Sequence, residues 1–341
     1  MKFKAALLAA ASMCAFSLSF AGDGVRLDGA GATFPAPLYK QWIKAWRDID
    51  PKTTIGYAAV GSAEGVRRFL DGKADFGASD APLTDGQIRS AAHGVVAVPA
   101  TAGMVVLVYN LPGLNGPLKL SRDTCMALLM GKIPRWSDAR IQAINPGLDL
   151  PNREIVLVAR LDGSGTTYAL TNHLNTVNPR WSTQGPGVGT RARWPDGTML
   201  MAGNEGVSTR VKLAVGSIGY VEYGFARRLG LPMAILENRD GNYVAPTDVS
   251  GAAAIATNSV EGQKVDAAAL ADPAGANAYP VVSYSWLMLR KDYGDAEKSA
   301  ALKRFVAWGL EAGQDSAAAL GYIKLPANAS QLGRDLLTNI H

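Results

Sequence analysis

Cysteine and histidine are scarce in this sequence, which excludes the sites that depend on them. The chain has 2 cysteines and 3 histidines. The histidines, His93, His173 and His341, lack the spacing that metal ligands require, and His173 is expected on a helix surface rather than as a general base. Cys125 lies among apolar neighbours in DTCMALLMGKIP, a setting typical of a buried thiol. We therefore expect no metal centre.

Blocks of like charge are absent as well. The 34 basic and 29 acidic residues give a formal net charge of +5, and they are spread along the chain without a basic run or a basic helical stripe. A nucleic-acid partner is therefore not expected. With 48% hydrophobic and 18% charged residues, the composition is typical of a globular protein, and the length fits two ordinary domains or one large one.

The apolar run at the N-terminus is too short and too poorly flanked for a stable membrane anchor. A basic start and an acid-free stretch at 5–20 lead to small residues, Ser19 and Ala21, at the positions of a cleavage site. This pattern predicts a secretory signal peptide over residues 1–21. Cleavage after Ala21 would leave Cys125 as the one cysteine, so no disulfide within the exported chain is expected.

The motifs of common enzyme classes are also missing. The sequence contains no G-x-x-x-x-G-K-[ST] nucleotide loop and no G-x-S-x-G nucleophile elbow. GAGATF at 29–34 nearly matches the dinucleotide motif G-x-G-x-x-G, but Phe34 takes the place of the third glycine. We therefore expect no catalytic residue and no cofactor, and a site that binds rather than reacts.

Short β-branched runs alternate with helical patterns along the chain, which predicts an α/β fold with mostly parallel sheets covered by helices. Strands are expected at 53–60 and 154–160, each followed by a helical pattern. Apolar residues at three- and four-residue steps mark the first helix, namely Leu38, Trp42, Ile43, Trp46 and Ile49.

Three further segments carry structural signals. The uncharged run VVAVPATAGMVVLVYN at 95–110 is interrupted by Pro99 and Gly103, and it predicts two buried strands joined by a short turn. Thr84-x-x-Gln87 predicts a capping box at the start of a short helix. Helices are also expected at roughly 296–312 and 330–340.

Small and hydroxyl residues precede helical patterns in three turns. The turns are GAGATFPAP at 29–37, AVGSAEGV at 59–66 and ARLDGSGTTY at 159–168. A helix start leaves backbone N–H groups unpaired, and these groups together with the helix dipole favour an anion. The same residue types are also ordinary helix caps, so one such turn alone does not establish a site.

A series of segments, in order along the chain, resembles one protein family. The segments are GAGATFPAPLYKQW, GSAEGV, DFGASDAPL, LMGKIPRWSD, NPGLDLP, RLDGSGTTY, RWPDG and GSIGYVEYGFA. From about residue 27 to 325 the chain is similar to the periplasmic phosphate-binding protein of the bacterial phosphate ABC transporter. The resemblance implies the periplasmic-binding-protein fold, with two α/β lobes joined by crossing hinge strands and the ligand in the cleft. Lobe one would comprise 22–107 plus 282–341, and lobe two 108–281.

The same resemblance implies inorganic phosphate as the ligand and assigns contacts in lobe one. Thr33 and Phe34 would give backbone N–H groups, with the Thr33 hydroxyl added. Ser62 would give its N–H and hydroxyl, and Asp80 would accept a hydrogen bond from a protonated phosphate oxygen. Phosphate carries a proton near neutral pH and sulfate does not, so a carboxylate acceptor would discriminate between them.

Lobe two would complete the site through the turn that follows one strand. Arg160 would supply the cation, the only one expected in the cleft, and Asp162 would hold it in place. Hydroxyls and amides would come from Ser164, Gly165 and Thr166. The receptor would act as a monomer in the periplasm and deliver phosphate to the permease subunits in the inner membrane.

Two departures from the family pattern and several alternatives stay open. The turn Ser62-Ala63-Glu64-Gly65 replaces a glycine-rich one, with Glu64 expected to face solvent, and the segment 194–207 lacks its expected glycines. Another tetrahedral oxyanion, such as arsenate, or a phosphate ester is an alternative ligand. A periplasmic phosphatase is the alternative of a different class, and the absence of a nucleophile–base pair or metal cluster in the sequence disfavours it.

Overall fold

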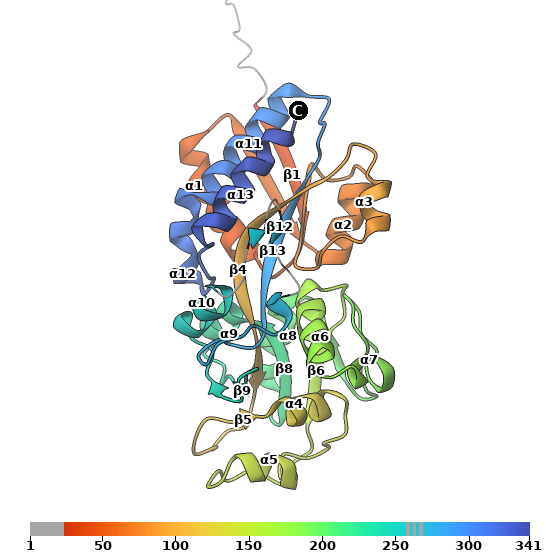
Figure 1. The fold of residues 1–341 in the computed structure, drawn as a ribbon, viewed down its shortest axis with the longest axis vertical. Coiled ribbons are helices and arrows are strands. Elements are labelled where there is room, and N and C mark those ends of the chain that lie inside the picture. The colour runs from red at the N-terminus through yellow and green to blue at the C-terminus, as the bar shows by residue number, and fades with distance from the viewer. Residues whose placement is uncertain (1–23, 257–259, 262–263, 266–268) are drawn as a thin grey trace, which may run out of the picture.

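The computed structural model describes residues 24–256, 260–261, 264–265 and 269–341. The signal peptide expected at 1–21 lies outside these residues. None of the helices in the described ranges combines the length and the hydrophobicity that a membrane crossing requires. The molecule is elongated, with two halves stacked along its long axis (Figure 1).

Eight strands form one sheet that extends through both halves, in the order β2-β1-β3-β13-β4-β8-β6-β7. Their bounds are β1 Val25–Gly31, β2 Thr53–Ala59, β3 Phe76–Ser79, β4 Val96–Tyr109, β6 Val156–Arg160, β7 Met199–Met201, β8 Ser217–Glu222 and β13 Val282–Leu289. Pairing is parallel among β2, β1 and β3 and among β8, β6 and β7, whereas β13 and β4 pair antiparallel with each other and with β3 and β8. The expected parallel sheets are therefore present at both ends, and the centre is antiparallel.

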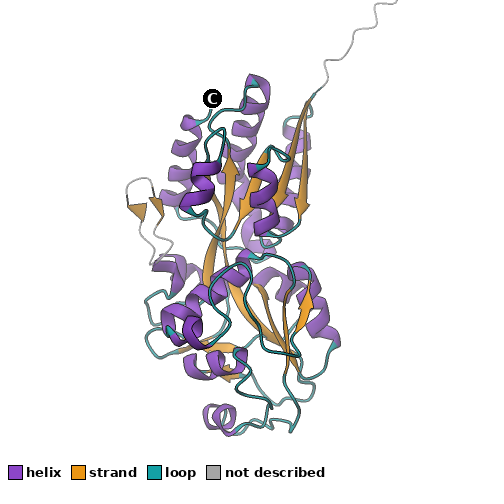
Figure 2. Cartoon of the chain, turned by 90° about the vertical axis from the view of Figure 1, so that its right-hand side faces the viewer, coloured by secondary structure: helices purple, strands orange, loops and turns teal. Residues whose placement is uncertain are grey.

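Helices flank the strands in both halves (Figure 2). The upper half in Figure 1 contains α1 Ala36–Ile49, α2 Ser62–Leu70, α3 Asp85–Ser90, α11 Ala296–Leu310, α12 Ala317–Leu320 and α13 Ala327–Leu336. The lower half contains α4 Arg122–Leu129, α5 Ala139–Ile144, α6 Gly165–Val177, α7 Arg180–Gln184, α8 Gly203–Leu213, α9 Tyr223–Leu229 and α10 Asp248–Ala256. The helices expected near the C-terminus thus belong to the same half as α1 and α2.

Short elements complete the described chain. A small sheet is formed by β5 Lys119–Leu120, β9 Ile235–Glu237 and β10 Tyr243–Val244, and β11 Val260–Glu261 pairs with β12 Lys264–Val265. The 3-10 turns are η1 Ala269–Ala271, η2 Ala312–Ser316 and η3 Leu337–Asn339. The capping box of α3 is present as predicted, because Thr84 and Gln87 each accept a hydrogen bond from the other's backbone N–H.

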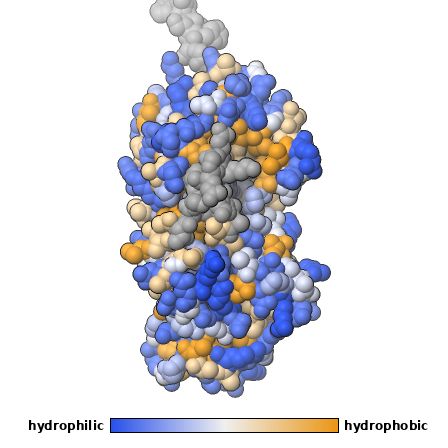
Figure 3. Space-filling view, viewed as in Figure 1, coloured by the Kyte–Doolittle hydropathy of each residue, from blue (hydrophilic) through white to orange (hydrophobic). Residues whose placement is uncertain are grey.

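The helix expected from the apolar steps after residue 36 is α1, and its core side chains are buried. Leu38, Trp42 and Trp46 are no more than 4% exposed, and the indole of Trp42 donates to the carbonyl of Gly313 at 2.8 Å. Ile49 shares the apolar spacing but is the last residue of the helix, and it is 52% exposed. Hydrophilic residues cover most of the face shown in Figure 3.

The two strands expected within 95–110 are one strand, β4, of 14 residues. Its first part pairs with β13 and its second part with β8. The register between β4 and β13 shifts where Trp286 faces Pro99, and this bulge accommodates a residue that lacks a backbone N–H. A Cβ at Gly103 would lie 2.8 Å from the Phe34 ring, so this position of the strand requires a residue without a side chain. Proline and glycine therefore shape β4 without ending it.

A close contact between α2 and β1 depends on a glycine. A Cβ added at Gly65 would lie 2.2 Å from the Cα of Gly31 and 2.8 Å from the carbonyl oxygen of Ala30. Both neighbours are backbone atoms, so they cannot move aside as a flexible side chain would. The absence of a side chain at Gly65 therefore sets how closely the helix lies on the sheet.

We predict that Gly65→Ala lowers the free energy of unfolding by at least about 2 kcal/mol, because the added methyl group forces the helix away from the sheet. Gly86→Ala is the matched control, since its nearest neighbour would lie 3.8 Å away and alanine favours the helix. Urea denaturation of both variants checks the prediction. Equal stability of the two variants would show that α2 tolerates the displacement.

Candidate anion-binding site

The loops that follow parallel strands of the two halves meet at the centre of the molecule. Thr33 follows β1, Ser62 follows β2 and Asp80 follows β3 in the upper half. Arg160 ends β6 in the lower half, and the turn after it leads into α6. Carboxyl ends of parallel strands are the usual place for ligands in open α/β sheets, and here two such edges face one another.

Arg160 is buried, and Asp162 fixes its guanidinium group. Its Nε donates to Oδ1 of Asp162 at 2.9 Å, one terminal nitrogen donates to the other carboxylate oxygen, and the second donates to the hydroxyl of Thr166 at 3.3 Å. Burial opposes ionisation of Asp162, but the hydrogen bonds and charge of Arg160 outweigh it and lower the pKa of that carboxyl. The side chain expected to hold Arg160 therefore does so, and the cation is largely neutralised.

The two halves contact each other directly through the glycine turn of α6. The N–H of Gly165 donates to the hydroxyl of Ser62 at 3.0 Å, and the N–H of Ala63 donates to the carbonyl of Gly163 at 2.9 Å. A Cβ on Gly165 would lie 2.6 Å from both Oδ2 of Asp80 and Oγ of Ser62. Only glycine allows this approach, so the backbone N–H groups at the start of α6 reach the opposite half.

The other proposed contacts lie around the same point. Ser164 caps α6 by accepting from the N–H of Thr167 at 3.1 Å, so its hydroxyl oxygen is already engaged. The carbonyl of Phe34 accepts from the hydroxyl of Tyr322 at 2.6 Å, which fixes the loop after β1. The structure thus brings all the predicted site residues to the junction of the two halves, namely Thr33, Phe34, Ser62, Asp80, Arg160, Asp162, Ser164, Gly165 and Thr166.

Asp80 is the buried carboxyl group of the site. It is 3% exposed, and its Oδ1 accepts a hydrogen bond from the hydroxyl of Ser285 at 2.7 Å. Burial raises its pKa to about 7, although the hydrogen bonds from Ser285 and Ser62 and the charge of Arg160 act to lower it. Near neutral pH the group is therefore poised between accepting and donating a hydrogen bond.

Asn204, at the start of α8, was missed by the sequence analysis. Its side-chain amide donates to the hydroxyl of Thr33 at 2.9 Å and to that of Thr166 at 3.3 Å, and its oxygen accepts from the N–H of Glu222 at 2.9 Å. It therefore links both halves and the end of β8. It lies within 194–207, the segment that departs from the family pattern, and no local motif marks it.

Glu222 is a second buried carboxyl group that the sequence did not reveal. It is fully buried at the end of β8, where Oε1 accepts from the N–H of Gly224 at 2.8 Å and caps α9. Its Oε2 has no hydrogen-bond partner among the described residues. Burial raises the pKa of Glu222 to about 8, against the opposing effects of the Gly224 N–H and the charge of Arg228.

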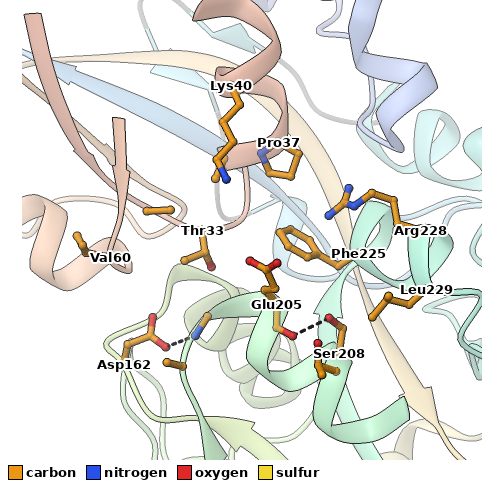
Figure 4. A pocket seen from close by; sticks show the side chains of 15 residues that line it. Thr33, Pro37, Lys40, Val60, Asp162, Glu205, Ser208, Phe225, Arg228 and Leu229 are labelled. Carbon is orange, nitrogen blue, oxygen red and sulfur yellow. Dashed lines mark hydrogen bonds between the residues drawn. The ribbon is translucent and has the colours of Figure 1, made fainter. Parts of the chain in front are cut away.

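A cavity of about 490 Å³ adjoins the site between the two halves (Figure 4). Lys40 and Arg228 line it together with Glu205, and so do Thr33 and Asp162 of the predicted site. Arg160 was expected to be the only cation in the cleft, and this expectation was wrong because two further cations line the adjoining space. Arg160 remains the buried one, at 5% exposure.

Three smaller expectations can be compared with the structure. His173 is buried, not on a helix surface, because its Nδ1 lies 2.7 Å from the carbonyl oxygen of Ala271. Cys125 is buried as predicted, and burial raises the pKa of its thiol to about 12. Glu64 was expected to face solvent; its side chain is 33% exposed, and its carboxylate pairs with Arg67 and Arg68 of its own helix. Within the described ranges, no group of three or more His, Cys, Asp or Glu residues is arranged to hold a metal ion.

Comparisons with known proteins agree on one family. The PBP superfamily domain matches residues 19–312. The chain is 34% identical over 303 residues to the phosphate-binding protein PstS of Haemophilus influenzae, covering 89% of each chain. It is 35% identical to the phosphate-binding protein PstS of Pasteurella multocida, covering 96% of this chain and 94% of the relative.

Solved structures show the same fold. The protein superposes on a high-affinity periplasmic phosphate-binding protein (PfluDING) bound with phosphate, with a TM-score of 0.74 and 21% identity, covering 91% of this chain and 93% of the other. A phosphate-binding protein from Stenotrophomonas maltophilia gives a TM-score of 0.70 at 20% identity, covering 92% and 94%. The expected fold, two α/β halves joined by crossing strands, is confirmed.

The raised pKa of Glu222 makes stability depend on pH. The ordinary pKa of a glutamate is 4.5, and that of Glu222 in the folded chain is about 8. Between these two pH values the folded chain holds a proton on Glu222 and the unfolded chain does not. The stabilisation is therefore fully present below pH 4.5 and is lost as the pH rises through 8. Relative to Glu222→Gln, we predict that the wild type loses about 2 kcal/mol of unfolding free energy between about pH 6 and about pH 8.

Urea denaturation in phosphate-free buffer at both pH values measures this difference. The exposed Glu205 gives the control variant Glu205→Gln, which should follow the wild type. If the wild type and Glu222→Gln lost stability in parallel, Glu222 would not hold a proton in the folded state.

Proposed function

Because the chain belongs to the PstS family of phosphate-binding proteins within the PBP superfamily, we propose that it binds one inorganic phosphate ion at the junction of the two halves. The observation that carries this proposal is the convergence of one buried guanidinium, one buried carboxyl and the N-terminus of α6 on a single point. The relatives are binding proteins by name, and the site residues offer hydrogen-bond donors that suit an anion.

Phosphate suits this set of groups because it can accept many hydrogen bonds and can also donate one. Arg160 presents paired N–H groups from one half. The N–H groups of Gly165 and Thr166 and the hydroxyls of Ser62 and Thr33 would surround the remaining oxygens. In the structure Ser62 accepts from Gly165 and Thr33 accepts from Asn204. A bound ion would exchange these mutual hydrogen bonds for bonds to its own oxygens.

Asp80 would distinguish phosphate from a fully ionised oxyanion. Phosphate and Asp80 would share one proton, carried by the ligand when Asp80 is ionised. Sulfate brings no proton near neutral pH, so its oxygen and an ionised Asp80 would place two lone pairs against each other. Such a mismatch in a buried site gives large selectivity, because neither group can turn to water.

The division into lobes supports a transport role. Lobe one would comprise 22–107 plus 282–341 and lobe two 108–281, with β4 and β13 as the strands that cross between them (Figure 1). Ser62 and Asp80 lie on one side and Gly165 on the other, so a bound ion would hold the lobes closed. The receptor would act in the periplasm as a monomer and release phosphate to the permease subunits of an ABC importer in the inner membrane.

We predict that Arg160→Ala weakens phosphate binding by at least two decades while the fold is retained. Removing the charged partner of a buried anion costs about 3–5 kcal/mol, since the remaining dipoles cannot replace its charge-assisted hydrogen bonds. Isothermal titration calorimetry measures the affinity, and circular dichroism verifies the fold. Arg135→Ala, at an exposed arginine paired with Glu154, is the control and should bind like the wild type. An Arg160→Ala affinity equal to that of this control would remove Arg160 from the site.

A further inference from the structure

A buried serine on a crossing strand holds the Asp80 carboxyl group. Ser285 lies on β13, is 0% exposed, and donates its hydroxyl to Oδ1 of Asp80 at 2.7 Å. The two residues are 205 positions apart in the sequence. Ser285 pairs with Thr101 of β4 and Trp286 pairs with Pro99, so Ala100 is the extra residue of a β-bulge in β4 beside Ser285.

The hydroxyl of Ser285 determines which carboxylate oxygen of Asp80 is available to a ligand. Because Oδ1 faces the serine, Oδ2 faces the turn of α6, where a Cβ on Gly165 would lie 2.6 Å away. An anion bound by the N–H of Gly165 would therefore meet Oδ2. A nearby serine provides a comparison, since Ser283 donates to the backbone carbonyl of Asp80 at 3.3 Å. The two hydroxyls hold the same residue at different atoms.

We propose that Ser285 is a specificity-determining residue, whose hydroxyl favours the ionised form of Asp80 and directs Oδ2 toward the ligand, so that the site prefers a protonated oxyanion to one without a proton. Ser285 acts through Asp80 and is a positioning residue, not a ligand contact. The inference rests on the proposed function, because it takes phosphate to be bound beside Asp80.

Groups from several elements act on the Asp80 carboxyl. The pKa of Asp80 is raised chiefly by burial and further by Asp162, and of the groups that lower it, the Ser285 hydroxyl acts most strongly, ahead of Arg160 and Ser62. The ionisable neighbours from α1, β2, β8 and the chain after α12 are Tyr39, Tyr57, Glu222 and Tyr322. The pKa values of these four groups are all raised, so the groups stay uncharged at neutral pH. Ionisation of Asp80 is therefore favoured chiefly by the hydroxyl of Ser285 and the charge of Arg160.

The sign of the effect follows from what each form of Asp80 can do. The ionised form accepts a hydrogen bond and suits a protonated phosphate oxygen, whereas the protonated form donates and suits sulfate. Sulfate binding should therefore increase as the pH falls through the pKa of Asp80. Without the serine hydroxyl the pKa is higher, so sulfate binding begins at a higher pH and the preference for phosphate at neutral pH is smaller.

The test is a competition between phosphate and sulfate at about pH 6, 7 and 8.5 on the full exported chain. We expect Ser285→Ala to lower the phosphate-to-sulfate preference at pH 7 by at least about fivefold and to shift the pH profile upward. Ser285→Thr keeps the hydroxyl and should restore the wild-type profile. Ser283→Ala removes the neighbouring hydroxyl from β13 and should change the preference by less than about twofold.

Ser285→Cys is a second variant in case the alanine protein does not fold, since a thiol has a similar shape but is a weak donor. It should show the same upward shift. The inference would be overturned if Ser285→Ala and Ser285→Cys both kept the wild-type phosphate-to-sulfate preference and pH profile. It would also be overturned if they bound phosphate and sulfate more weakly by the same factor at every pH. If the wild type itself did not bind phosphate, the proposed function would fail first, and with it the basis of the inference.

Discussion

The Asp80 carboxyl group is buried where the two halves of the molecule meet, and the rest of the site depends on how its charge is satisfied there. A carboxylate beside an anion is stable only if a proton lies between them. Arg160 brings one positive charge, and Asp162 already offsets it. The buried part of the site therefore carries no excess positive charge, and its choice of ligand must come from the arrangement of donors and acceptors rather than from attraction to negative charge.

The fold provides that arrangement by placing two parallel-strand edges face to face. The loops after β1, β2 and β3 come from one half, and the turn after β6 comes from the other. The crossing strands β4 and β13 bring the edges together, and β13 also supplies the serine that orients Asp80. Residues that share one small site are thus separated by more than 100 positions in the chain, as Gly165 and Ser62 are.

The sequence predicted those features that depend on neighbours in the chain. The turns at Ser62 and Gly165 were found because small residues before a helical pattern form a local signal, and the resemblance to a known family assigned their roles. The single strand β4 was not foreseen, because Pro99 and Gly103 normally interrupt strands. A bulge accommodates Pro99, and the Phe34 ring occupies the space that a side chain at position 103 would need.

Other parts of the site could not be predicted because their partners are remote. Asn204 bonds Thr33 across 171 positions, and Ser285 bonds Asp80 across 205. Neither residue belongs to a motif, and an asparagine or serine without its partner is indistinguishable from a surface residue. His173 was placed wrongly for the same reason, since its buried partner is the carbonyl of Ala271, 98 positions away.

The most direct test of the account is the phosphate-to-sulfate preference of Asp80→Asn, measured by competition titration at neutral pH. The hydroxyl of Ser285 should select the amide oxygen of asparagine and leave its N–H group facing the ligand. The clash of lone pairs with sulfate then becomes a hydrogen bond, and the preference should fall by at least tenfold, or about 1.4 kcal/mol. A preference equal to that of the wild type would contradict the claim that a proton shared with Asp80 selects the ligand.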